Sequence, residues 1–495
     1  MLKLLPSGYG AQMTLGFGSA LSQSADGSIV AISGPGYSYE YGPTYSGYTG
    51  AVWVFKQNVL MGNQLTGLGF SGQSQQGTSI SLSSDGYTLA VGGYFDGDSE
   101  TGATWVFKRN TDDTWSQMGN KLIGTGFVST SYQGPGQGAS VSLSSNGTVL
   151  AVGGPYDNGN KGAVWLFTRD SNDIWTQNGN KIVGSLGSSG PIANQGTSVS
   201  LSGDGKILAV GGISDGDNIG AAWIFDTSTG TEITKLVGTG NIGNSGQGKS
   251  ISLSSDGKTL AVGGPGDDSQ VGAVWMYRNN GSGWMQIGKL IGSHVPGIVS
   301  MGNSVSISGN GTELVVGGPG DNNSTGCTWL FTDTNSVFSE ITKYVIPQEN
   351  NQANSVNVSS DGSSILVSCL NGLGYVYVIP VSSISGYIPP TYPPTYPPTY
   401  PPTYPPTYPP TYPPTYEPDS ISTYPPTYEP DSISTYPPTY LPVAQPVVQS
   451  LTLSDKLAIG LSICIPLLIL MIVLAILKHF EIIFSTSLVN KTDKR

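Results

Sequence analysis

The chain has 495 residues, of which 70 are glycine and 34 are proline, and only 11% are charged. This length allows a large folded domain with further segments, and many glycines with few charges suit a turn-rich, all-β domain. The formal net charge of −12 argues against a nucleic-acid partner, because affinity for the phosphate backbone comes from lysine and arginine.

The first clear unit lies at residues 77–126 and contains four alternating apolar runs. The runs at 78–82 and 87–91 flank the dipeptide Asp85-Gly86. This arrangement predicts a β-hairpin with a type I′ turn, in which both central residues have positive φ. The runs at 103–107 and 115–123 follow a polar, acidic loop. The unit therefore predicts a four-stranded antiparallel meander.

The hairpin dipeptide recurs every 51 to 61 residues along the first three quarters of the chain. Its copies are Asp26-Gly27, Asp85-Gly86, Asn146-Gly147, Asp204-Gly205, Asp256-Gly257, Asn310-Gly311 and Asp361-Gly362. Such a period is typical of repeat proteins, and seven units of four strands predict an all-β fold, a seven-bladed β-propeller. We assign the propeller to residues 1–382.

Two positions repeat with the strands. The third strand carries a tryptophan that we expect to pack against a neighbouring blade, since alternate residues share a sheet face. These residues are Trp53, Trp105, Trp165, Trp223, Trp275 and Trp329, with Tyr377 in the seventh copy. The fourth strand carries a lysine at Lys121, Lys181, Lys235, Lys289 and Lys343, with Gln64 in the first copy. We interpret these lysines as protection of a sheet edge rather than as a binding patch.

The seventh copy stops after its third strand, at residues 375–378. The missing strand has a match at the other end of the chain, where residues 3–8 mirror residues 121–126. We therefore expect the N-terminal segment to form the outer strand of the last blade and to close the ring. The same segment has no long apolar stretch and does not fit the pattern of a signal peptide.

The repeat resembles the FG-GAP repeat of integrin-α-type β-propellers. The matching features are a glycine before the first strand, the Leu-Ala-Val-Gly-Gly-Pro sequence at 150–155 and 260–265, and the Gly-Ala-Val-Trp sequence at 162–165 and 272–275. Calcium-binding FG-GAP blades carry an Asp-rich loop between strands one and two. Here a tight turn stands in its place, which leaves too few oxygen ligands for calcium. The resemblance therefore implies the fold without the calcium sites.

Acidic loops between the second and third strands are the main candidates for a site. Their weak candidate metal ligands are Asp96, Asp98, Asp215, Asp217, Asp267 and Asp321. Because the loops are equivalent, we expect them on one face of the ring. Asp and Asn also favour turns, which would explain them without a ligand. The alternative is a weak cation site or a rim that binds an unknown protein or glycan ligand.

The sequence gives no catalytic assignment and no cofactor. Two histidines, His294 and His479, assemble no triad or metal site, and there is no Cys-x-x-Cys or phosphate-binding loop. Cys464 lies in an apolar segment. For Cys327 and Cys369, in adjacent blades, we expect buried free thiols rather than a disulfide, in keeping with a reducing compartment.

A proline- and tyrosine-rich tract follows the propeller, and we assign residues 383–450 to a low-complexity stalk. Residues 389–416 are seven consecutive Pro-Pro-Thr-Tyr units, and two more lie at 425–428 and 437–440. This composition favours polyproline II, so residues 387–440 would span about 170 Å. The simplest role is a semi-rigid stalk, and adhesive material is a further alternative.

The same unit matches Pro-Pro-x-Tyr, the ligand pattern of WW domains, which bind polyproline II in an aromatic groove. The candidate ligand residues are Pro389, Pro390, Tyr392, Pro425, Pro426, Tyr428, Pro437, Pro438 and Tyr440. Nine copies would raise the avidity for WW-domain proteins.

Residues 457–477 form 21 consecutive uncharged, mostly apolar positions, which predict one transmembrane helix. A short basic tail follows at 478–495. The positive-inside rule places this tail in the cytosol or inside a particle, with the propeller outside. The late span without a signal peptide favours the opposite topology, a tail anchor with a cytosolic propeller.

Together these features predict a single-pass membrane protein that displays a recognition or adhesion module and is not an enzyme. The layout is similar to that of membrane proteins of large DNA viruses that encode propeller repeats, which would place it in a virion or host membrane. The second hypothesis is a tail-anchored adaptor that recruits WW-domain proteins. The third is a propeller hydrolase acting on glycans.

Overall fold

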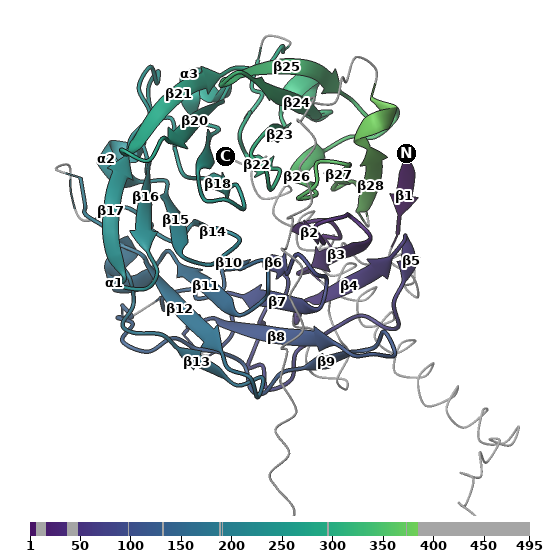
Figure 1. Cartoon of the computed structure of the whole chain (residues 1–495), viewed down its shortest axis with the longest axis vertical. Helices are drawn as coiled ribbons and strands as arrows, with labels where there is room; N and C mark the ends of the chain where they lie inside the picture. The colour runs from purple at the N-terminus through teal and green to yellow at the C-terminus, as the bar shows by residue number, and fades with distance from the viewer. Residues whose placement is uncertain are drawn as a thin grey trace, which may run out of the picture. The chain divides into compact units, whose positions relative to one another are not determined.

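The computed structural model describes residues 1–5, 16–36, 48–97, 99–130, 133–187, 190, 192–294, 297–372 and 374–384. The chain divides into two units, Met1–Pro398 and Thr399–Arg495, and the described residues all belong to the first. These residues form seven four-stranded antiparallel sheets, arranged as blades around a common centre (Figure 1). The predicted seven-bladed β-propeller is therefore confirmed.

Each of the first three blades has a short outer strand. Blade 1 contains β2 (Leu21–Gln23), β3 (Ile29–Gly34), β4 (Ala51–Lys56) and β5 (Val59–Leu60). Blade 2 contains β6 (Ser79–Leu82), β7 (Thr88–Gly93), β8 (Ala103–Arg109) and β9 (Trp115–Gln117). Blade 3 contains β10 (Ser140–Leu143), β11 (Val149–Gly154), α1 (Asp157–Asn160), β12 (Ala163–Arg169) and β13 (Trp175–Gln177).

The next three blades have a longer outer strand. Blade 4 contains β14 (Ser198–Leu201), β15 (Ile207–Gly212), α2 (Asp215–Asn218), β16 (Ala221–Asp226) and β17 (Thr231–Leu236). Blade 5 contains β18 (Ser250–Leu253), β19 (Thr259–Gly264), α3 (Asp267–Gln270), β20 (Ala273–Asn279) and β21 (Trp284–Leu290). Blade 6 contains β22 (Ser304–Ile307), β23 (Glu313–Gly318), α4 (Asp321–Ser324), β24 (Cys327–Thr334) and β25 (Val337–Tyr344).

Blade 7 joins the two ends of the propeller. It contains β26 (Gln352–Val358), β27 (Ser364–Cys369), β28 (Tyr375–Pro380) and the N-terminal strand β1 (Leu2–Leu4), and η1 (Val381–Ser383) follows β28. β1 pairs antiparallel with β28, with Leu2 opposite Val378 and Leu4 opposite Val376, and the two strands lie side by side in Figure 1. The predicted closure by the N-terminal segment is confirmed.

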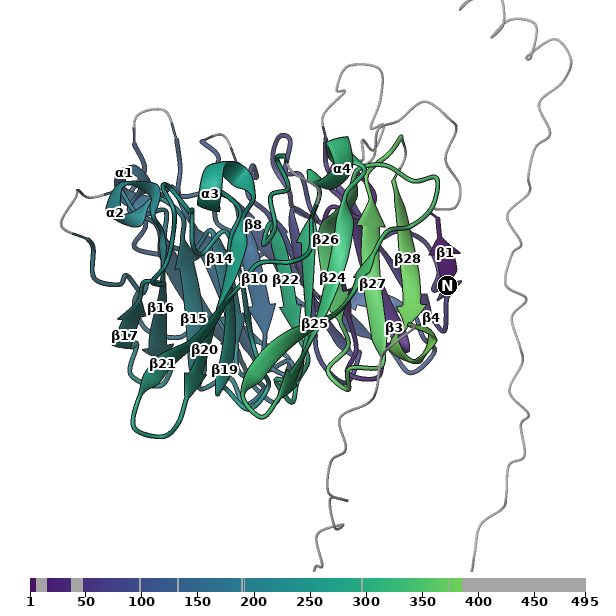
Figure 2. The same cartoon turned by 90° about the horizontal axis from the view of Figure 1, so that it is seen from above.

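The ring has two distinct faces (Figure 2). The loop face carries the connections between second and third strands, including α1 to α4, and the linkers from each blade to the next. The turn face carries the Asp/Asn-Gly turns between first and second strands and the hairpins between third and fourth strands. Because third strands run from the loop face to the turn face, β28 delivers Pro380 and η1 to the turn face. There Val381 N–H donates to the Ser363 carbonyl over 2.8 Å.

The prediction of type I′ turns at the Asp-Gly and Asn-Gly pairs is wrong. Only the glycine of each pair has positive φ, whereas a type I′ turn needs positive φ at both residues. In blade 1, Gly27 has φ 69°, whereas Asp26 is not in the left-handed region. The Ser24 hydroxyl and the Ser28 N–H donate to Asp26 Oδ1 over 2.6 and 3.0 Å. These bonds favour a type I turn followed by a left-handed glycine. They also hold the pKa of Asp26 below its usual value.

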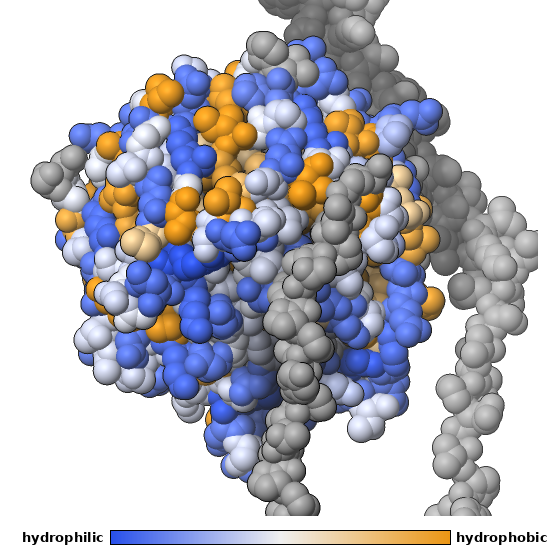
Figure 3. Space-filling view, turned by 45° about the horizontal axis from the view of Figure 1, so that its top comes forward, coloured by the Kyte–Doolittle hydropathy of each residue, from blue (hydrophilic) through white to orange (hydrophobic). Residues whose placement is uncertain are grey.

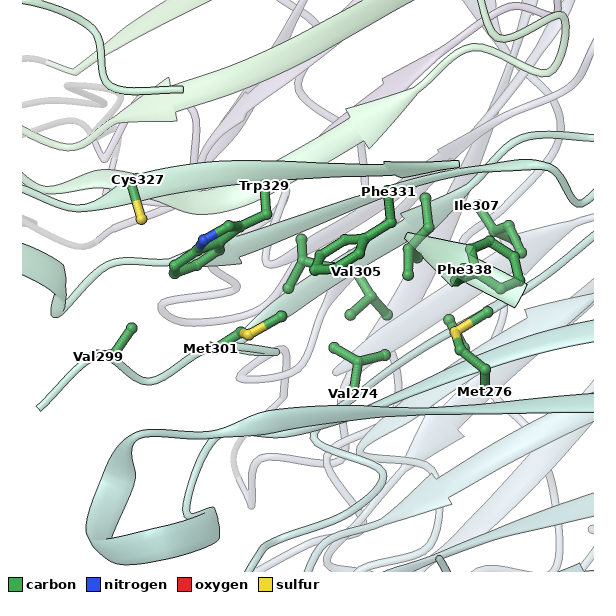
Figure 4. Packing of buried hydrophobic residues seen from close by; sticks show 13 residues of the cluster. Val274, Met276, Val299, Met301, Val305, Ile307, Cys327, Trp329, Phe331 and Phe338 are labelled. Carbon is green, nitrogen blue, oxygen red and sulfur yellow. The ribbon is translucent and has the colours of Figure 1, made fainter. Parts of the chain in front are cut away.

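The hydrophobic core is divided into clusters that lie between neighbouring blades. Figure 4 shows the cluster between blades 5 and 6, where Val274 and Met276 face Trp329 and Phe331. All six predicted tryptophans are fully buried, at 0% exposure. Each blade thus buries both of its sheet faces, and the predicted packing of the tryptophans between blades is confirmed.

Serine side chains connect the innermost strands of consecutive blades. In six junctions a serine hydroxyl accepts a hydrogen bond from a backbone N–H of the next inner strand, as Ser81 does from Leu143 over 3.0 Å. The other pairs are Ser22–Leu82, Ser142–Leu201, Ser200–Leu253, Ser252–Ile307 and Ser306–Val358. Inner strands have an unpaired edge, and these bonds satisfy part of it.

A closed ring of backbone hydrogen bonds joins all seven turns at the centre of the turn face. In six blades the residue after the turn serine donates its N–H to a turn of the neighbouring blade, and in blade 7 the donor is Asp361, two residues after Ser359; the distances are 2.8 to 3.0 Å. The donor–acceptor pairs are Ala25–Ser84, Ser84–Ser145, Ser145–Gly203, Gly203–Ser255, Ser255–Gly309, Gly309–Ser360 and Asp361–Ala25. The last pair links blade 7 to blade 1, so the ring is closed at its centre as well as at its outer strand.

Candidate functional site on the loop face

The acidic loops contain one turn of left-handed helix in each of blades 3 to 6. In α3, Asp268, Ser269 and Gln270 follow Asp267 with φ of 46°, 57° and 72°. Three successive non-glycine residues in this region cost about 1–2 kcal/mol each, so the surroundings must hold them in place. The linkers do so. Asp268 N–H donates to the carbonyl of Ile242 over 2.9 Å, and Gln270 accepts from Val299 and Ser300.

The first aspartate of each loop is buried and forms an ion pair with the lysine of the fourth strand. In blade 5, Asp267 is 1% exposed at its side chain and lies 2.6 Å from Lys289 Nζ, while its other oxygen accepts the Ile242 N–H over 2.8 Å. The equivalent pairs are Lys121–Asp96, Lys181–Asp157, Lys235–Asp215 and Lys343–Asp321. We call these five pairs the blade locks. The lysines are 15% to 21% exposed, so interpreting them as edge protection has to be corrected.

Each lock lies close to the buried tryptophan of its blade. In blades 4 to 6 the lysine ammonium lies 5.1 to 5.7 Å from the indole centroid, within the range of a cation–π contact. The indole N–H donates to a linker carbonyl, as Trp165 does to Thr125 over 2.8 Å. Gly124 lies flat on that indole, and a Cβ there would stand 2.1 Å from Trp165 Cδ1. Loop, outer strand and linker are therefore fixed by one residue cluster per blade.

The predicted metal ligands are placed individually rather than as a shared site. Asp96, Asp215, Asp267 and Asp321 each belong to a separate lock, and Asp217 is exposed on α2. Asp98 lies outside the described residues. Within the described ranges, no group of three or more His, Cys, Asp or Glu side chains is placed to hold a metal ion. The loops gather on one face, as expected, but their buried carboxylates serve lysines and backbone N–H groups.

Blade 7 has a different arrangement, which we call the closing latch. Lys3 on β1 lies opposite Tyr377, and its Nζ is 2.8 Å from Glu349 Oε1 in the linker before the blade. The Tyr377 hydroxyl donates to the same oxygen over 2.7 Å, and Lys3 Nζ lies 3.5 Å from the Tyr375 ring centroid. The sequence match between residues 3–8 and 121–126 predicted the position of Lys3 in the outer strand of blade 7. Glu349 has no equivalent in the other copies.

The latch groups shift one another's pKa. Burial alone would lower the pKa of Lys3, but its hydrogen bonds to Glu349 and Tyr377 raise it above 10.5. Burial alone would raise the pKa of Glu349, but the hydrogen bonds from Lys3 and Tyr377 lower it below 4.5. Both shifts favour the charged pair, so β1 is held by an ion pair as well as by three residues of sheet.

The two cysteines of the described propeller are buried side chains at the loop-face ends of β24 and β27. Cys327 and Cys369 are free and buried, as expected. Burial raises the pKa of Cys369 to about 12 and raises that of Cys327 as well, so both remain protonated thiols at neutral pH. His294 is exposed and makes a 2.9 Å contact from Nδ1 to the Gly292 carbonyl.

Aliphatic side chains are exposed at equivalent points around the loop face. The residue two places after each strand-four lysine is 39% to 51% exposed. These residues are Leu5, Ile123, Val183, Val237, Ile291 and Val345. The linkers add Ile242 and Ile298, at 55% and 58%. Figure 3 shows that exposed apolar side chains form small patches separated by polar ones on the visible side of the molecule.

The predicted stalk beyond residue 384, the WW ligands and the membrane segment lie outside the described residues. Within the described ranges, no helix is long and apolar enough to cross a membrane.

Comparisons with known proteins do not identify a family for this chain. No protein-family model matches the chain, and no curated protein sequence matches it. Among solved structures, it is similar to Kuenenia stuttgartiensis hydrazine synthase, with a TM-score of 0.47 and 14% identity over 76% of this chain and 99% of that chain. At this similarity the comparison carries no inference about activity. The chain is defined by its structure as a seven-bladed β-propeller.

Proposed function

We propose that the protein is a non-enzymatic, membrane-anchored recognition or adhesion module of the FG-GAP type, displayed on a virion or on a host membrane. The observation that carries this proposal is the exit point of the chain. β28 ends at Pro380 on the turn face, and the stalk and the apolar segment at 457–477 follow from there. The loop face would then point away from the membrane, toward a partner.

The charges of the two faces support this orientation. Exposed aspartates occupy five of the seven turns on the turn face: Asp26, Asp85, Asp204, Asp256 and Asp361. An acidic surface disfavours contact with the anionic lipids of a membrane. The loop face buries its first aspartates in the locks and exposes aliphatic side chains at regular intervals.

The proposal is tested by adhesion of particles that carry the full chain. Ile242→Asp changes the loop face and Met285→Asp changes the turn face of the same blade, and the two side chains are 55% and 53% exposed. We expect Ile242→Asp to reduce adhesion to receptive cells at least tenfold and Met285→Asp to leave it within twofold. Equal adhesion by both variants would refute display through the loop face.

The second candidate function is recruitment of WW-domain proteins by a tail-anchored adaptor. Nine Pro-Pro-Thr-Tyr copies favour it. It requires the tract to face the cytosol. Isolated WW domains should then capture a peptide of residues 389–416, and a Tyr→Ala version should not be captured. Failure of that peptide to bind would remove this candidate.

A further inference from the structure

A groove lies on the outer rim of the propeller between blades 1 and 2, with a volume of about 810 Å³. One wall is formed by the end of β4, by β5 and by residues 61–65 of blade 1, and the other by residues 112–115 of the hairpin before β9 in blade 2. Sites for small ligands usually measure about 300–1,000 Å³ and combine an apolar floor with a few polar groups. The groove has the size of such a site, so its chemistry decides which ligand it fits.

An outward bulge of the fourth strand of blade 1 opens this groove. Met61 N–H donates to the Val54 carbonyl over 2.7 Å, and pairing with β4 resumes at Leu65. Between these two points Gly62 has φ 70°, and a Cβ there would meet nothing within 4 Å. A left-handed glycine is typical of a bulge, in which the chain turns away from the neighbouring strand. The bulge places the exposed Asn63 on the wall of the groove.

The floor of the groove is apolar and aromatic. Met61, Leu65 and Trp115 are partly buried and pack against the core between blades 1 and 2. The indole N–H of Trp115 has no hydrogen-bond acceptor among the described residues, and an unpaired buried N–H costs free energy. A ligand that carries oxygen acceptors is therefore favoured over a pure hydrocarbon.

The polar groups of the walls both donate and accept hydrogen bonds. Lys56 Nζ lies 2.6 Å from Asp113 Oδ2, and both side chains are 43% exposed. Asp112, Gln57 and Asn63 are exposed on the same walls. An ammonium group donates, a carboxylate accepts and a carboxamide does both. The walls therefore suit a ligand whose own groups both donate and accept.

The groove carries little net charge. Its lining contains one lysine and two aspartates, and Arg109 also contacts Asp113, with Nε 2.8 Å from Oδ1. A strongly anionic or cationic ligand therefore finds no field of opposite sign to attract it. A hydroxyl group, by contrast, is uncharged and both donates and accepts hydrogen bonds. These properties together favour a neutral ligand with many hydroxyl groups, whose C–H faces can pack on the apolar floor.

We propose that the groove between blades 1 and 2 binds a neutral oligosaccharide. The C–H face of one sugar ring packs on Trp115 and Met61, and the hydroxyl groups bond to Asn63 and to the Lys56–Asp113 pair. A peptide is a poorer fit, because extended peptides bind by pairing with a regular strand edge, which the bulge at 61–64 interrupts. The site faces the outer rim and uses none of the exposed aliphatic residues of the loop face, so it goes beyond the proposed function.

Two related grooves in the chain provide a comparison. The groove between blades 2 and 3, of about 580 Å³, repeats the composition with Met118 and Asn120, but its Trp175 is only 9% exposed. The groove between blades 3 and 4, of about 320 Å³, contains Asn180 but has Thr229 in its hairpin and no aromatic residue in its lining. We expect the second groove to bind the sugar more weakly than the first, and the third to leave it unbound.

Saturation-transfer difference NMR on the full chain tests this proposal, with maltotriose, cellotriose and mannotriose as probes. Asn63→Ala removes the carboxamide, and Lys56→Met removes the ammonium group but keeps most of the stem. Both side chains lie outside the core, and exposed ion pairs contribute little to stability, so both variants should fold. Asn180→Ala, in the groove without an aromatic residue, is the matched control. We expect at least one trisaccharide to bind, each groove variant to weaken its binding at least fivefold, and the control to bind within twofold of the unmodified chain.

Three results would overturn the proposal. The first is that none of the three trisaccharides binds the unmodified chain. The second is that Asn63→Ala and Lys56→Met bind as well as the Asn180→Ala control does. The third is that decaproline, tested in parallel as a peptide probe, binds in place of the sugars and is lost in the same variants, which would assign the groove to a peptide. None of these results bears on adhesion through the loop face, so this inference and the proposed function can fail separately.

Discussion

The five locked blades and the closing blade solve the same problem with different residues. In blades 2 to 6, an aspartate from the blade's own loop neutralises the lysine of the outer strand over a buried tryptophan. In blade 7, the lysine comes from the N-terminus, the acid from the preceding linker, and Tyr377 replaces the tryptophan. The continuous blades bury their carboxylates at 1% to 5% exposure, whereas Glu349 is 13% and Lys3 35% exposed. The closing blade is therefore the weaker junction electrostatically, and it relies more on pairing of β1 with β28.

The largest expected effect comes from removing the closing strand. Deletion of residues 1–5 exposes the edge of β28 and removes Leu4, which is 3% exposed within the core cluster of blades 7 and 1. We expect a loss of more than about 3 kcal/mol in the free energy of unfolding, together with self-association through the open edge. Denaturant unfolding and size-exclusion chromatography measure the two. A monomer of unchanged stability would show that β1 does not close the ring.

Breaking a lock should cost almost as much. Asp157→Ala leaves the Lys181 ammonium without its partner in a site where it is only 18% exposed, and it also removes the acceptor of the Val128 N–H. We expect a loss of about 3 kcal/mol, and the same for Asp267→Ala in blade 5.

The matched control for the lock is the double variant Asp157→Ala with Lys181→Met, which removes both charges. It should recover part of the lost stability in denaturant unfolding, because no unpaired charge remains. A loss below about 1 kcal/mol for Asp157→Ala alone would place the lock among ordinary surface ion pairs.

The latch should show a smaller effect with a distinctive pH dependence. Lys3→Met should cost about 1 kcal/mol at neutral pH. The raised pKa of Lys3 means that its contribution is present below pH 10.5 and is lost as pH rises through the folded value. The lowered pKa of Glu349 means that its contribution is present above pH 4.5 and is lost as pH falls through the folded value.

The stability difference between the unmodified chain and Lys3→Met should therefore be largest between about pH 5 and 10 and shrink at both ends. Thermal unfolding at several pH values measures it. A difference that stays constant across the range would mean that packing, rather than charge, holds Lys3 in place.

The smallest expected effect separates the tyrosine hydroxyl from its ring. Tyr377→Phe keeps the packing against β1 and removes the 2.7 Å hydrogen bond to Glu349. We expect a loss of about 0.5–1 kcal/mol in denaturant unfolding. A loss of 3 kcal/mol would make the latch as strong as a lock and would contradict the comparison above.

The repeat in the sequence was sufficient to predict the blades, and the match of residues 3–8 to 121–126 was sufficient to predict the closing strand. The locks were missed because Asp157, in α1, and Lys181, after β13, are 24 residues apart in the sequence and meet only in the folded blade. The aspartate and the lysine recur together in five copies of the repeat, and this joint recurrence could have predicted the ion pairs. The turn type was wrong because the serine two residues before each Asp or Asn changes the local hydrogen bonding. The latch acid was missed because Glu349 appears once, outside the repeat.

The orientation of the propeller is the central claim of the proposed function, and protease protection tests it most directly. Intact particles or membranes would carry the full chain with one epitope tag before Met1 and another after Arg495. Display through the loop face predicts that protease removes the N-terminal tag and spares the C-terminal one. Protection of the N-terminal tag with loss of the C-terminal one would contradict display and would make the Pro-Pro-Thr-Tyr tract of a cytosolic adaptor the leading functional element.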